Sequence, residues 1–383
     1  MHDWLIFLVS FAQSYKSIRM YIFKGCIFFA ILTCFAHAGD SSAIALPSTN
    51  TIPQERPSFG FQLENDLFLA DDDNYTNGIR LSFLSKSCDN QAQGTSDALA
   101  KSLGTLTGGT NASPAWSKFC GMDRNASLRQ QWAVTLTQLM FTPKTMSSKR
   151  IIGEHPYAGY LALGIGTLVK DEDTANSFEL QLGTTGHASL ADRSQDAIHD
   201  IWQINKWPNW KSQLPSEFAF CFYFKKYYRL RFLEYKSGDG FETDGFAYWH
   251  TDLGTVYLRG GVGMSYRFGY NLPNTSVDFP INGATYLNNP FVKRENYTSN
   301  WSIYGFTGFA VRAIGHDLFL DGTVFHNSPH YVDKYPVVCD VNAGVGARYK
   351  NVDFLFGLFF RSQEYVHQEP IHAMGSFEIK ISF

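Results

Sequence analysis

Apolar and polar residues alternate along this chain with a period of two, and the pattern recurs from Ser58 to the last residue, Phe383. Between Ser58 and Phe68 most odd-numbered positions are apolar and most even-numbered ones small or polar, and residues 79–83 and 377–383 repeat this order. A period of two places neighbouring side chains on opposite faces of a β-strand. The pattern therefore predicts an all-β protein whose strands each have one apolar and one polar face.

Two details favour a membrane barrel over a soluble β-sandwich, whose strands alternate in the same way. The face opposite the apolar one carries Glu, Arg, Lys and Ser in the middle of strands, which suits the polar interior of an outer-membrane barrel. The chain also ends on an aromatic residue, which resembles the closing strand of bacterial outer-membrane proteins.

Breaks in the alternation separate about a dozen candidate strands. They lie near residues 58–68, 77–87, 130–141, 157–169, 177–187, 217–231, 241–252, 255–269, 301–320, 337–350, 352–364 and 372–383. An even number of strands closes a barrel. We therefore expect a 12-stranded antiparallel transmembrane β-barrel.

The first forty residues have the parts of an export signal. Lys24 precedes an apolar run from Cys26 to Phe35, and Ala36-His37-Ala38 then forms a cleavage-type tripeptide. Met20 stands directly before this pattern, so we expect translation to start there. The predicted organisation is an upstream extension and signal peptide over 1–38, a short periplasmic lead-in over 39–57, and the barrel over 58–383.

Composition excludes several other classes of protein. Hydrophobic residues are 44% of the chain and charged residues 17%, which rules out intrinsic disorder and a long charged coiled coil. The 32 Lys and Arg residues nearly balance the 35 Asp and Glu residues, so no basic surface is offered to a nucleic acid. Beyond the signal, Cys88 and Cys120 bracket a loop-like segment that a disulfide would close, although sequence alone leaves the pairing open.

The orientation follows if the first strand starts in the periplasm, because successive connections then alternate between the two sides of the membrane. The outward segments would be 69–76, 142–156, 188–216, 321–336 and 366–371. The periplasmic side would hold the tight turn Lys350-Asn351 and two long segments, 88–129 and 270–300, to which the sequence assigns no role.

One outward segment is predicted to be helical. Ser189 followed by Asp192 resembles a capping box, residues 191–206 contain no Gly or Pro, and Pro208 stops the run. The residues that share one face of this helix, at spacings of four, three and four, are Gln195, His199, Trp202 and Lys206.

Oxygen-bearing side chains cluster where the first two strands meet. Glu64-Asn65-Asp66 ends the first strand, and Asp71-Asp72-Asp73-Asn74-Tyr75-Thr76-Asn77-Gly78 leads into the second. Such oxygens are the ligands of a hard cation such as Ca²⁺, although the same residues would also make a plain solvated acidic loop. Asp66 and Thr76 have the inward parity of their strands, whereas the acidic triplet lies in the turn, so the pair is the better candidate for a site.

His199 is the candidate general base, because the pKa of an imidazole lies close enough to neutrality for it to take a proton from water. The alternative is an ordinary surface histidine. The chain contains no G-x-S-x-G elbow and no H-E-x-x-H pair, which disfavours a serine hydrolase of the α/β type and a zinc protease.

Six strings follow one another in a specific order. They are Glu64-Asn65-Asp66-Leu67-Phe68; Tyr75-Thr76-Asn77-Gly78-Ile79-Arg80-Leu81-Ser82; Pro156-Tyr157-Ala158-Gly159-Tyr160; Gln195 and His199 with Pro208, Trp210, Gln213 and Glu217; Arg267-Phe268-Gly269-Tyr270-Asn271; and Phe319-Leu320-Asp321-Gly322. Together they resemble the lipid A 3'-O-deacylase (LpxR) family of outer-membrane enzymes, from about Phe59 to Phe383. Each string is weak alone, whereas the ordered set is specific.

The resemblance implies a 12-stranded barrel whose site lies between the barrel wall and an extracellular helix that carries the catalytic histidine. It implies Ca²⁺-supported hydrolysis of the ester at the 3' position of lipid A in the outer leaflet of a Gram-negative outer membrane, by a chain that we expect to be a monomer. Residue by residue, it assigns His199 as the base and places Asn65, Asp66 and Thr76 in the site, where they would hold the metal or orient the base. Gln195 matches a further polar position.

Two positions depart from the family pattern. His155 stands where the family commonly has an Arg before the Pro-Tyr-Ala-Gly string, and Asn205 stands at an acidic position of some members. Lys149 and Arg150, in the same outward loop as His155, are candidates to bind a lipid A phosphate. The alternative is that this pair is a basic rim at the level of the lipopolysaccharide headgroups.

Two other functions fit a barrel of this kind. An outer-membrane phospholipase A is also a Ca²⁺-linked barrel, but it would need a serine nucleophile beside its histidine. A passive pore or an adhesin would leave the Asn65-Asp66 cluster and His199 as unrelated loop residues.

Overall fold

The fold is known from a computed structural model. It describes residues 55–66, 74–89, 92–123, 128–145, 147, 149, 151–202, 208–275, 280–281, 283–286, 290–292, 299–326 and 328–383. The expected export signal lies outside these residues, as does all but the end of the expected lead-in.

Within the described residues, twelve long strands and one two-residue strand make a single antiparallel sheet. The long strands are β1 (Ser58–Asn65), β2 (Asn74–Leu84), β3 (Arg129–Thr142), β4 (Ala158–Lys170), β5 (Thr174–Thr185), β6 (Phe218–Arg229), β8 (Phe241–Gly254), β9 (Tyr257–Tyr270), β10 (Trp301–Asp317), β11 (Val337–Tyr349), β12 (Val352–Ser362) and β13 (Ile371–Ser382). The short strand β7 (Tyr235–Lys236) only extends the edge of β8.

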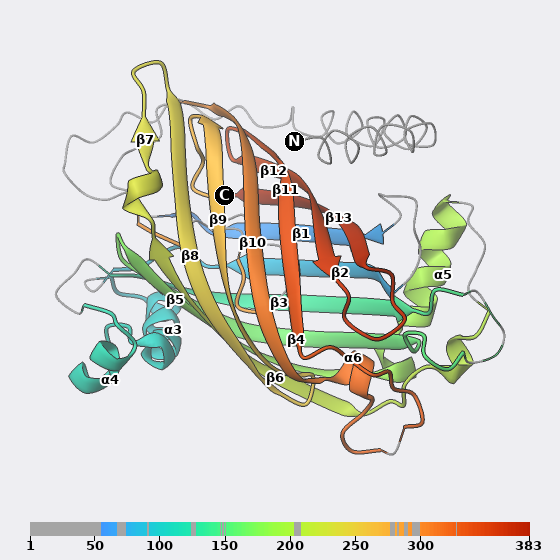
Figure 1. Ribbon diagram of the computed structural model, residues 1–383. Helices are drawn as coiled ribbons and strands as arrows, with labels where there is room; N and C mark the ends of the chain where they lie inside the picture. Colours follow the sequence, from blue (N-terminus) through green and yellow to red (C-terminus); the bar gives the residue numbers. More distant parts are fainter. Residues whose placement is uncertain are drawn as a thin grey trace.

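The sheet closes on itself. Strand β1 pairs with both β2 and β13, and β6 pairs with both β5 and β8, so each long strand has two neighbours. Closure removes the sheet edge that would otherwise leave backbone groups unpaired in lipid. The predicted 12-stranded antiparallel barrel is therefore confirmed, with β7 as a small addition that alternation did not reveal (Figure 1).

The period-two pattern places the two kinds of side chain as predicted. Phe59, Leu136 and Leu163 are 41%, 42% and 61% exposed and cover the outside of the wall. Their strand neighbours Gln62 and Thr135 are buried in the lumen. An apolar outer wall and a polar interior are what a barrel needs in a bilayer.

Ion pairs and hydrogen bonds fill much of the lumen. The carboxylate of Glu179 accepts hydrogen bonds from Arg80 at 2.6 Å and Thr135 at 2.5 Å, and all three side chains are buried. A second network joins Arg312 and Arg361 to Asp340. Buried charges are tolerated when they are paired in this way.

Part of the segment 270–300 enters the lumen, where it acts as a plug. The backbone N–H of Ile281 donates to Glu64 at 2.7 Å, and that of Ala284 donates to Glu179 at 2.9 Å. At the base of this segment the Arg267 guanidinium donates to the carbonyl of Thr275 at 2.7 Å. Carboxylates of the wall therefore hold backbone groups of the plug.

The helices lie at the two ends of the barrel. Helix α5 (Ala191–Trp202) stands at one end, whereas α3 (Thr95–Gly104) and α4 (Pro114–Phe119) stand at the opposite end (Figure 1). The remaining helical turns are α6 (Leu318–Asp321), η3 (Thr105–Thr107), η4 (Gly186–Ser189), η5 (Trp210–Ser212) and η6 (Arg231–Leu233). Within the described ranges, no helix combines the length and apolar character needed to span a bilayer.

The disulfide considered between Cys88 and Cys120 is not formed. Both are free thiols, as are Cys221 and Cys339. The Cys88 backbone pairs with Gln130, whereas Cys120 packs with Met122, Leu128 and Val169. The segment that a disulfide would have closed is held instead by packing and hydrogen bonds to the wall.

Candidate functional site

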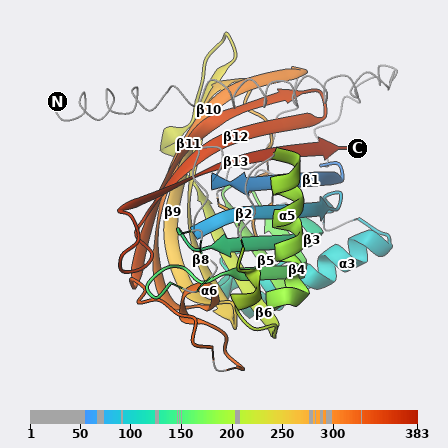
Figure 2. The ribbon, with the colours of Figure 1, turned by 90° about the vertical axis from the view of Figure 1, so that its right-hand side faces the viewer.

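Helix α5 packs against the outside of the barrel wall rather than inside the lumen. Its first residue, Ala191, joins Met140 of β3 and Tyr157 and Trp210 of the flanking loops in one buried apolar cluster. Met140 has the outward parity of Leu136 on the same strand. Viewed from the α5 end, the helix lies across the ends of β1 to β4 (Figure 2).

Gly159 permits the close approach of the helix to the wall. A Cβ atom built at this position in β4 would overlap the Oγ of Ser189 and the Cβ of Ala191. The side chain of Gln138 also donates to the carbonyl of Ser189 at 2.7 Å. The string Pro156-Tyr157-Ala158-Gly159-Tyr160 therefore contains a position where only glycine fits beneath the helix.

A β-bulge in β2 turns Thr76 toward the outside. The register shifts between Tyr75 and Asn77. Tyr75 points into the lumen, where its hydroxyl donates to Glu64 at 2.9 Å. Thr76 is the extra residue, and its Oγ1 lies 2.6 Å from the Oγ1 of Thr142, which has the same parity as outward Met140. The inward parity expected for Thr76 is therefore wrong, because a bulge inserts one residue and shifts the alternation.

Asn65 and Asn77 lie opposite each other at this end of β1 and β2. Asn77 is 2% exposed, and neither its Nδ2 nor its Oδ1 has a hydrogen-bond partner among the described residues. Asp66 is fully buried, but it follows the last residue of β1, so strand alternation does not fix its direction. The sequence places Asn77 in the same oxygen-rich string, but the pattern did not single it out as a site residue.

Gln195 and His199 occupy the same face of α5, one turn apart. Gln195 is 2% exposed and His199 is 1% exposed, so His199 is not an ordinary surface histidine. The indole N–H of Trp210 donates to the Oε1 of Gln195 at 2.5 Å, which fixes the orientation of the amide. The Nε2 of Gln195 is buried and finds no acceptor among the described residues.

Lys149, one of the two basic residues expected to bind phosphate, is exposed. The other, Arg150, lies outside the described residues, together with Asp71, Asp72, Asp73 and Asn205. His155 is buried against Phe141, with ring centroids 5.0 Å apart and planes 3° from parallel. Burial lowers the pKa of His155 to about 4, so its ring is neutral near neutral pH and does not supply the missing cation.

Other strings of the ordered set hold the loops at the α5 end. Glu217 accepts hydrogen bonds from the backbone N–H groups of Val324 at 2.9 Å and Phe325 at 3.0 Å. Asp321 accepts from Lys334 at 2.7 Å. These residues are structural ties between neighbouring connections.

The polar side chains at this end of β1, β2 and β3 are of the types that bind a hard cation. Asp66 supplies a carboxylate, Asn65 and Asn77 supply amide oxygens, and Thr76 and Thr142 supply hydroxyls, which are the ligand types of Ca²⁺ rather than of zinc. In the part of the chain that the structure covers, no three His, Cys, Asp or Glu side chains converge on a metal-binding position. The buried Oδ1 of Asn77 has no described hydrogen-bond partner, as expected of an atom that binds a group from outside the chain.

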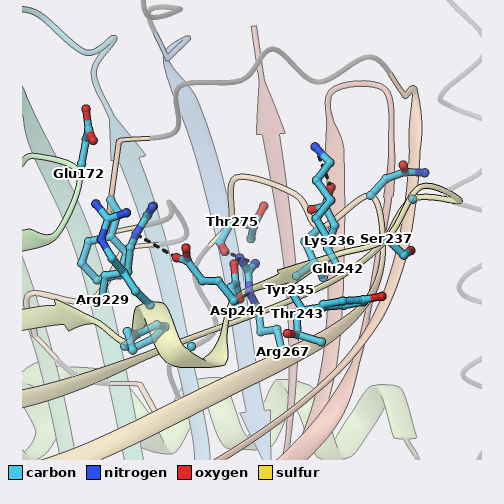
Figure 3. Close-up of a pocket in the computed structure, with 18 of the residues that line it drawn as sticks. Glu172, Arg229, Tyr235, Lys236, Ser237, Glu242, Thr243, Asp244, Arg267 and Thr275 are labelled. Atoms are coloured by element: carbon cyan, nitrogen blue, oxygen red, sulfur yellow. Dashed lines mark hydrogen bonds and ion pairs between the residues drawn. The ribbon is translucent and has the colours of Figure 1, made fainter.

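A separate cavity of about 620 Å³ lies at the opposite end of the barrel (Figure 3). Its charged residues pair with one another: Arg267 with Asp244 at 2.6 Å and Lys236 with Glu242 at 3.5 Å. Figure 3 shows Arg267 and Asp244 side by side, at paired positions of β9 and β8. The cavity lies far from α5 and contains none of the candidate site residues.

A family model described as "Outer membrane protein LpxR" matches residues 26–383. Among solved structures, LpxR from Salmonella typhimurium is similar, with a TM-score of 0.63 and 14% identity over 85% of this chain and 100% of that one. The β domain of the Bordetella autotransporter BrkA is matched at a TM-score of 0.38 and 7% identity, over 86% of this chain and 99% of that one. No curated protein sequence matches this chain.

Proposed function

We propose that this chain, which belongs to the LpxR family of outer-membrane proteins, removes the 3'-linked acyloxyacyl chain of lipid A by ester hydrolysis. The observation that supports the proposal is that buried polar side chains occupy both α5, at His199, and the ends of the strands across which α5 lies, at Asn65, Thr76 and Asn77. The protein resides in the outer membrane, where this face of the wall meets lipid.

The position of the cluster supports a lipid substrate. The lumen is filled by a core that includes Tyr75, Tyr223 and Phe306 from the wall and Ile281 and Ala284 from the plug. A site on the outer side of the wall lies on the side of the leaflet in which a lipid substrate diffuses. A passive pore would need a free path along the axis, so the same packing disfavours that alternative.

His199 would act as the general base. In its neutral form, one imidazole nitrogen takes a proton from water as the water attacks the ester carbonyl, and such catalysis is typically worth about 10²- to 10⁴-fold in rate. Gln195, held by Trp210, would orient the water or the carbonyl through its Nε2, which has no acceptor among the described residues. No covalent acyl-enzyme is required.

Ca²⁺ is the proposed cofactor, and Asn65, Asp66 and Thr76 are its proposed ligands, with the amide of Asn77 as an addition. When bound, the ion would supply positive charge that polarises the ester carbonyl. Lys149 and Arg150 are the proposed phosphate-binding residues, because His155 is neutral and enclosed. We also propose that the protein acts as a monomer.

Mass spectrometry of lipid A from cells that carry or lack the gene tests this function. We expect the gene to remove one acyloxyacyl unit, and the His199→Gln variant, which keeps size and hydrogen bonding but not basicity, to leave lipid A intact. Unchanged lipid A with cleaved glycerophospholipid would instead identify a phospholipase A. If neither lipid changes, the protein is not a lipid hydrolase.

A further inference from the structure

The long connection between β2 and β3 builds two helices at the end of the barrel opposite α5. One face of α3 packs on the wall, with Ala100 and Gly104 buried. A Cβ atom at Gly104 would lie 2.5 Å from the Oε1 of Gln130 and 3.1 Å from Val169. The helix is therefore pressed tightly against the base of β3 and β4.

The other face of this segment is an apolar stripe. Leu99, Leu103 and Leu106 are spaced by four and three residues, so they follow one side of α3 and the turn after it. Leu99 and Leu106 are 39% and 47% exposed. A soluble surface rarely gathers large apolar side chains in this way.

The short helix α4 also exposes large apolar side chains. Trp116 and Phe119 stack with ring centroids 5.1 Å apart, and they are 43% and 79% exposed. Lys118, between them, is also exposed and lies in the last turn of the helix. Aromatic and basic side chains together are typical of segments that lie in the headgroup region of a bilayer.

Contacts to the barrel hold α4 in this position. Asn176 of β5 donates to the carbonyl of Cys120 at 3.0 Å, and the ammonium of Lys226 of β6 also donates to this carbonyl. Asn176 donates in addition to the carbonyl of Thr107 at 2.9 Å. The wall therefore fixes both ends of the connection between η3 and the end of α4. The exposed aromatic residues of α4 are held in a defined position as a result.

The stripe is continuous with the lipid-facing wall. The indole N–H of Trp132 on β3 donates to the Oγ of Ser96 in α3 at 3.1 Å. The Trp132 ring lies 5.3 Å from Phe83, which lies 6.4 Å from Phe383, the exposed last residue of the chain. Trp132 and Phe83 have the outward parity of their strands, Phe383 directly follows β13, and in Figure 2 α3 lies outside the ring of strands. Aromatic girdles of this kind mark the level of the membrane surface.

We propose that residues 95–119 lie on the phospholipid leaflet at this end of the barrel, with the leucine stripe and the Trp116–Phe119 pair in the boundary between headgroups and acyl chains. In an exported barrel whose first strand starts in the periplasm, this is the inner leaflet. The segment would anchor the barrel against vertical movement and tilt. The proposal is independent of the catalytic activity.

A fluorescent label at residue 119 tests the contact. The Phe119→Cys variant is made in a Cys339→Ser background, because Cys88, Cys120 and Cys221 are buried and Cys26 and Cys34 lie in the expected signal peptide. It is labelled with an environment-sensitive fluorophore and reconstituted in phosphatidylethanolamine and phosphatidylglycerol vesicles. We expect blue-shifted emission and strong quenching by lipids brominated on the acyl chains. The matched control is Gly238→Cys at the same end, where an added Cβ meets no atom within 4 Å. Its label should emit as in water and resist quenching.

Two outcomes would overturn the proposal. One is a residue 119 label that behaves like the residue 238 label. The other is a residue 119 label whose emission is blue-shifted only at a high protein-to-lipid ratio and is not quenched by brominated lipid. That result would indicate that a second copy of this chain covers the stripe. A Trp116→Ser variant of the labelled protein should fold, as judged by its heat-modifiable mobility, yet show weaker quenching, because half of the aromatic pair is removed.

Discussion

The Gly159→Ala variant tests whether catalysis depends on how closely α5 approaches the wall. A single methyl group at this position would overlap Ser189 and Ala191, which precede and begin the helix. The helix lies outside the strand ladder, so it can move away while the barrel keeps its hydrogen bonds. We therefore expect the overlap to be relieved by displacement of α5.

The sizes of the competing effects predict a catalytic defect without a folding defect. Replacing Gly by Ala at a compatible position stabilises a protein by about 0.4–1 kcal/mol through the unfolded state. Overpacking typically costs about 1–3 kcal/mol, and here a helix shift absorbs it. A misplacement of about 1 Å between reacting groups can cost about 10²-fold in rate. Activity should thus fall about 100-fold while the barrel stays folded.

The assay is the initial rate of release of 3'-linked acyl chains from lipid A, followed by mass spectrometry, with heat-modifiable mobility as the measure of folding. Gly260→Ala on β9 is the matched control, because the nearest atom to its added Cβ is a carbonyl oxygen at 3.4 Å. The control should keep the parent rate. A Gly159→Ala protein that is as active as the parent would refute the argument that the close contact positions the catalytic helix.

Three further predictions concern the cofactor, the bulge and pH. Chelation with EGTA should abolish deacylation, and added Ca²⁺ should restore it. Full activity in metal-free enzyme would exclude the proposed role of the ion. Mg²⁺ should substitute poorly, because it demands a tighter octahedral shell. Thr76→Val, which keeps the shape of the side chain, should lower turnover far more than Asp72→Ala if the outward hydroxyl belongs to the site, and equal losses would contradict this. Burial lowers the pKa of His155 from 6.5 to about 4, so between these pH values the unfolded chain binds more protons than the folded one. The free energy of unfolding should therefore fall by about 1.4 kcal/mol per pH unit as the pH drops through that window. Urea unfolding of the parent and of His155→Gln at several pH values should show this slope only in the parent; Glu364 and His372 are the ionisable neighbours of the His155 ring.

The barrel could be predicted from the sequence because the two faces of each strand have different surroundings. Each strand faces lipid on one side and the lumen on the other, so a period of two appears in the sequence wherever the ladder is regular. The helix of the candidate site was also predictable, since a run without Gly or Pro begins at Ala191, as α5 does. Two of the four residues expected on one face, Gln195 and His199, are both buried, whereas Lys206 and the side chain of Trp202 lie outside the described residues.

The plug and the bulge left no comparable signal. The plug is held through backbone N–H groups of Ile281 and Ala284, which every non-proline residue carries, and its acceptors are more than a hundred residues away in the sequence. The bulge at Thr76 inserts one residue into an otherwise regular strand, and alternation read from either side of it gives a different face. Only the pairing of β2 with β3 reveals which face is correct.

The bulge joins the lumen to the outer site. Glu64 lies in the lumen and accepts hydrogen bonds from the Tyr75 hydroxyl at 2.9 Å and from the Ile281 N–H of the plug at 2.7 Å. The next residues along each strand, Asn65 and Thr76, belong to the outward cluster. Consecutive residues share a rigid backbone, so a contact that fixes Tyr75 inside the barrel also fixes Thr76 outside it. The packed lumen is therefore the support on which the outward residues Asn65 and Thr76 are held.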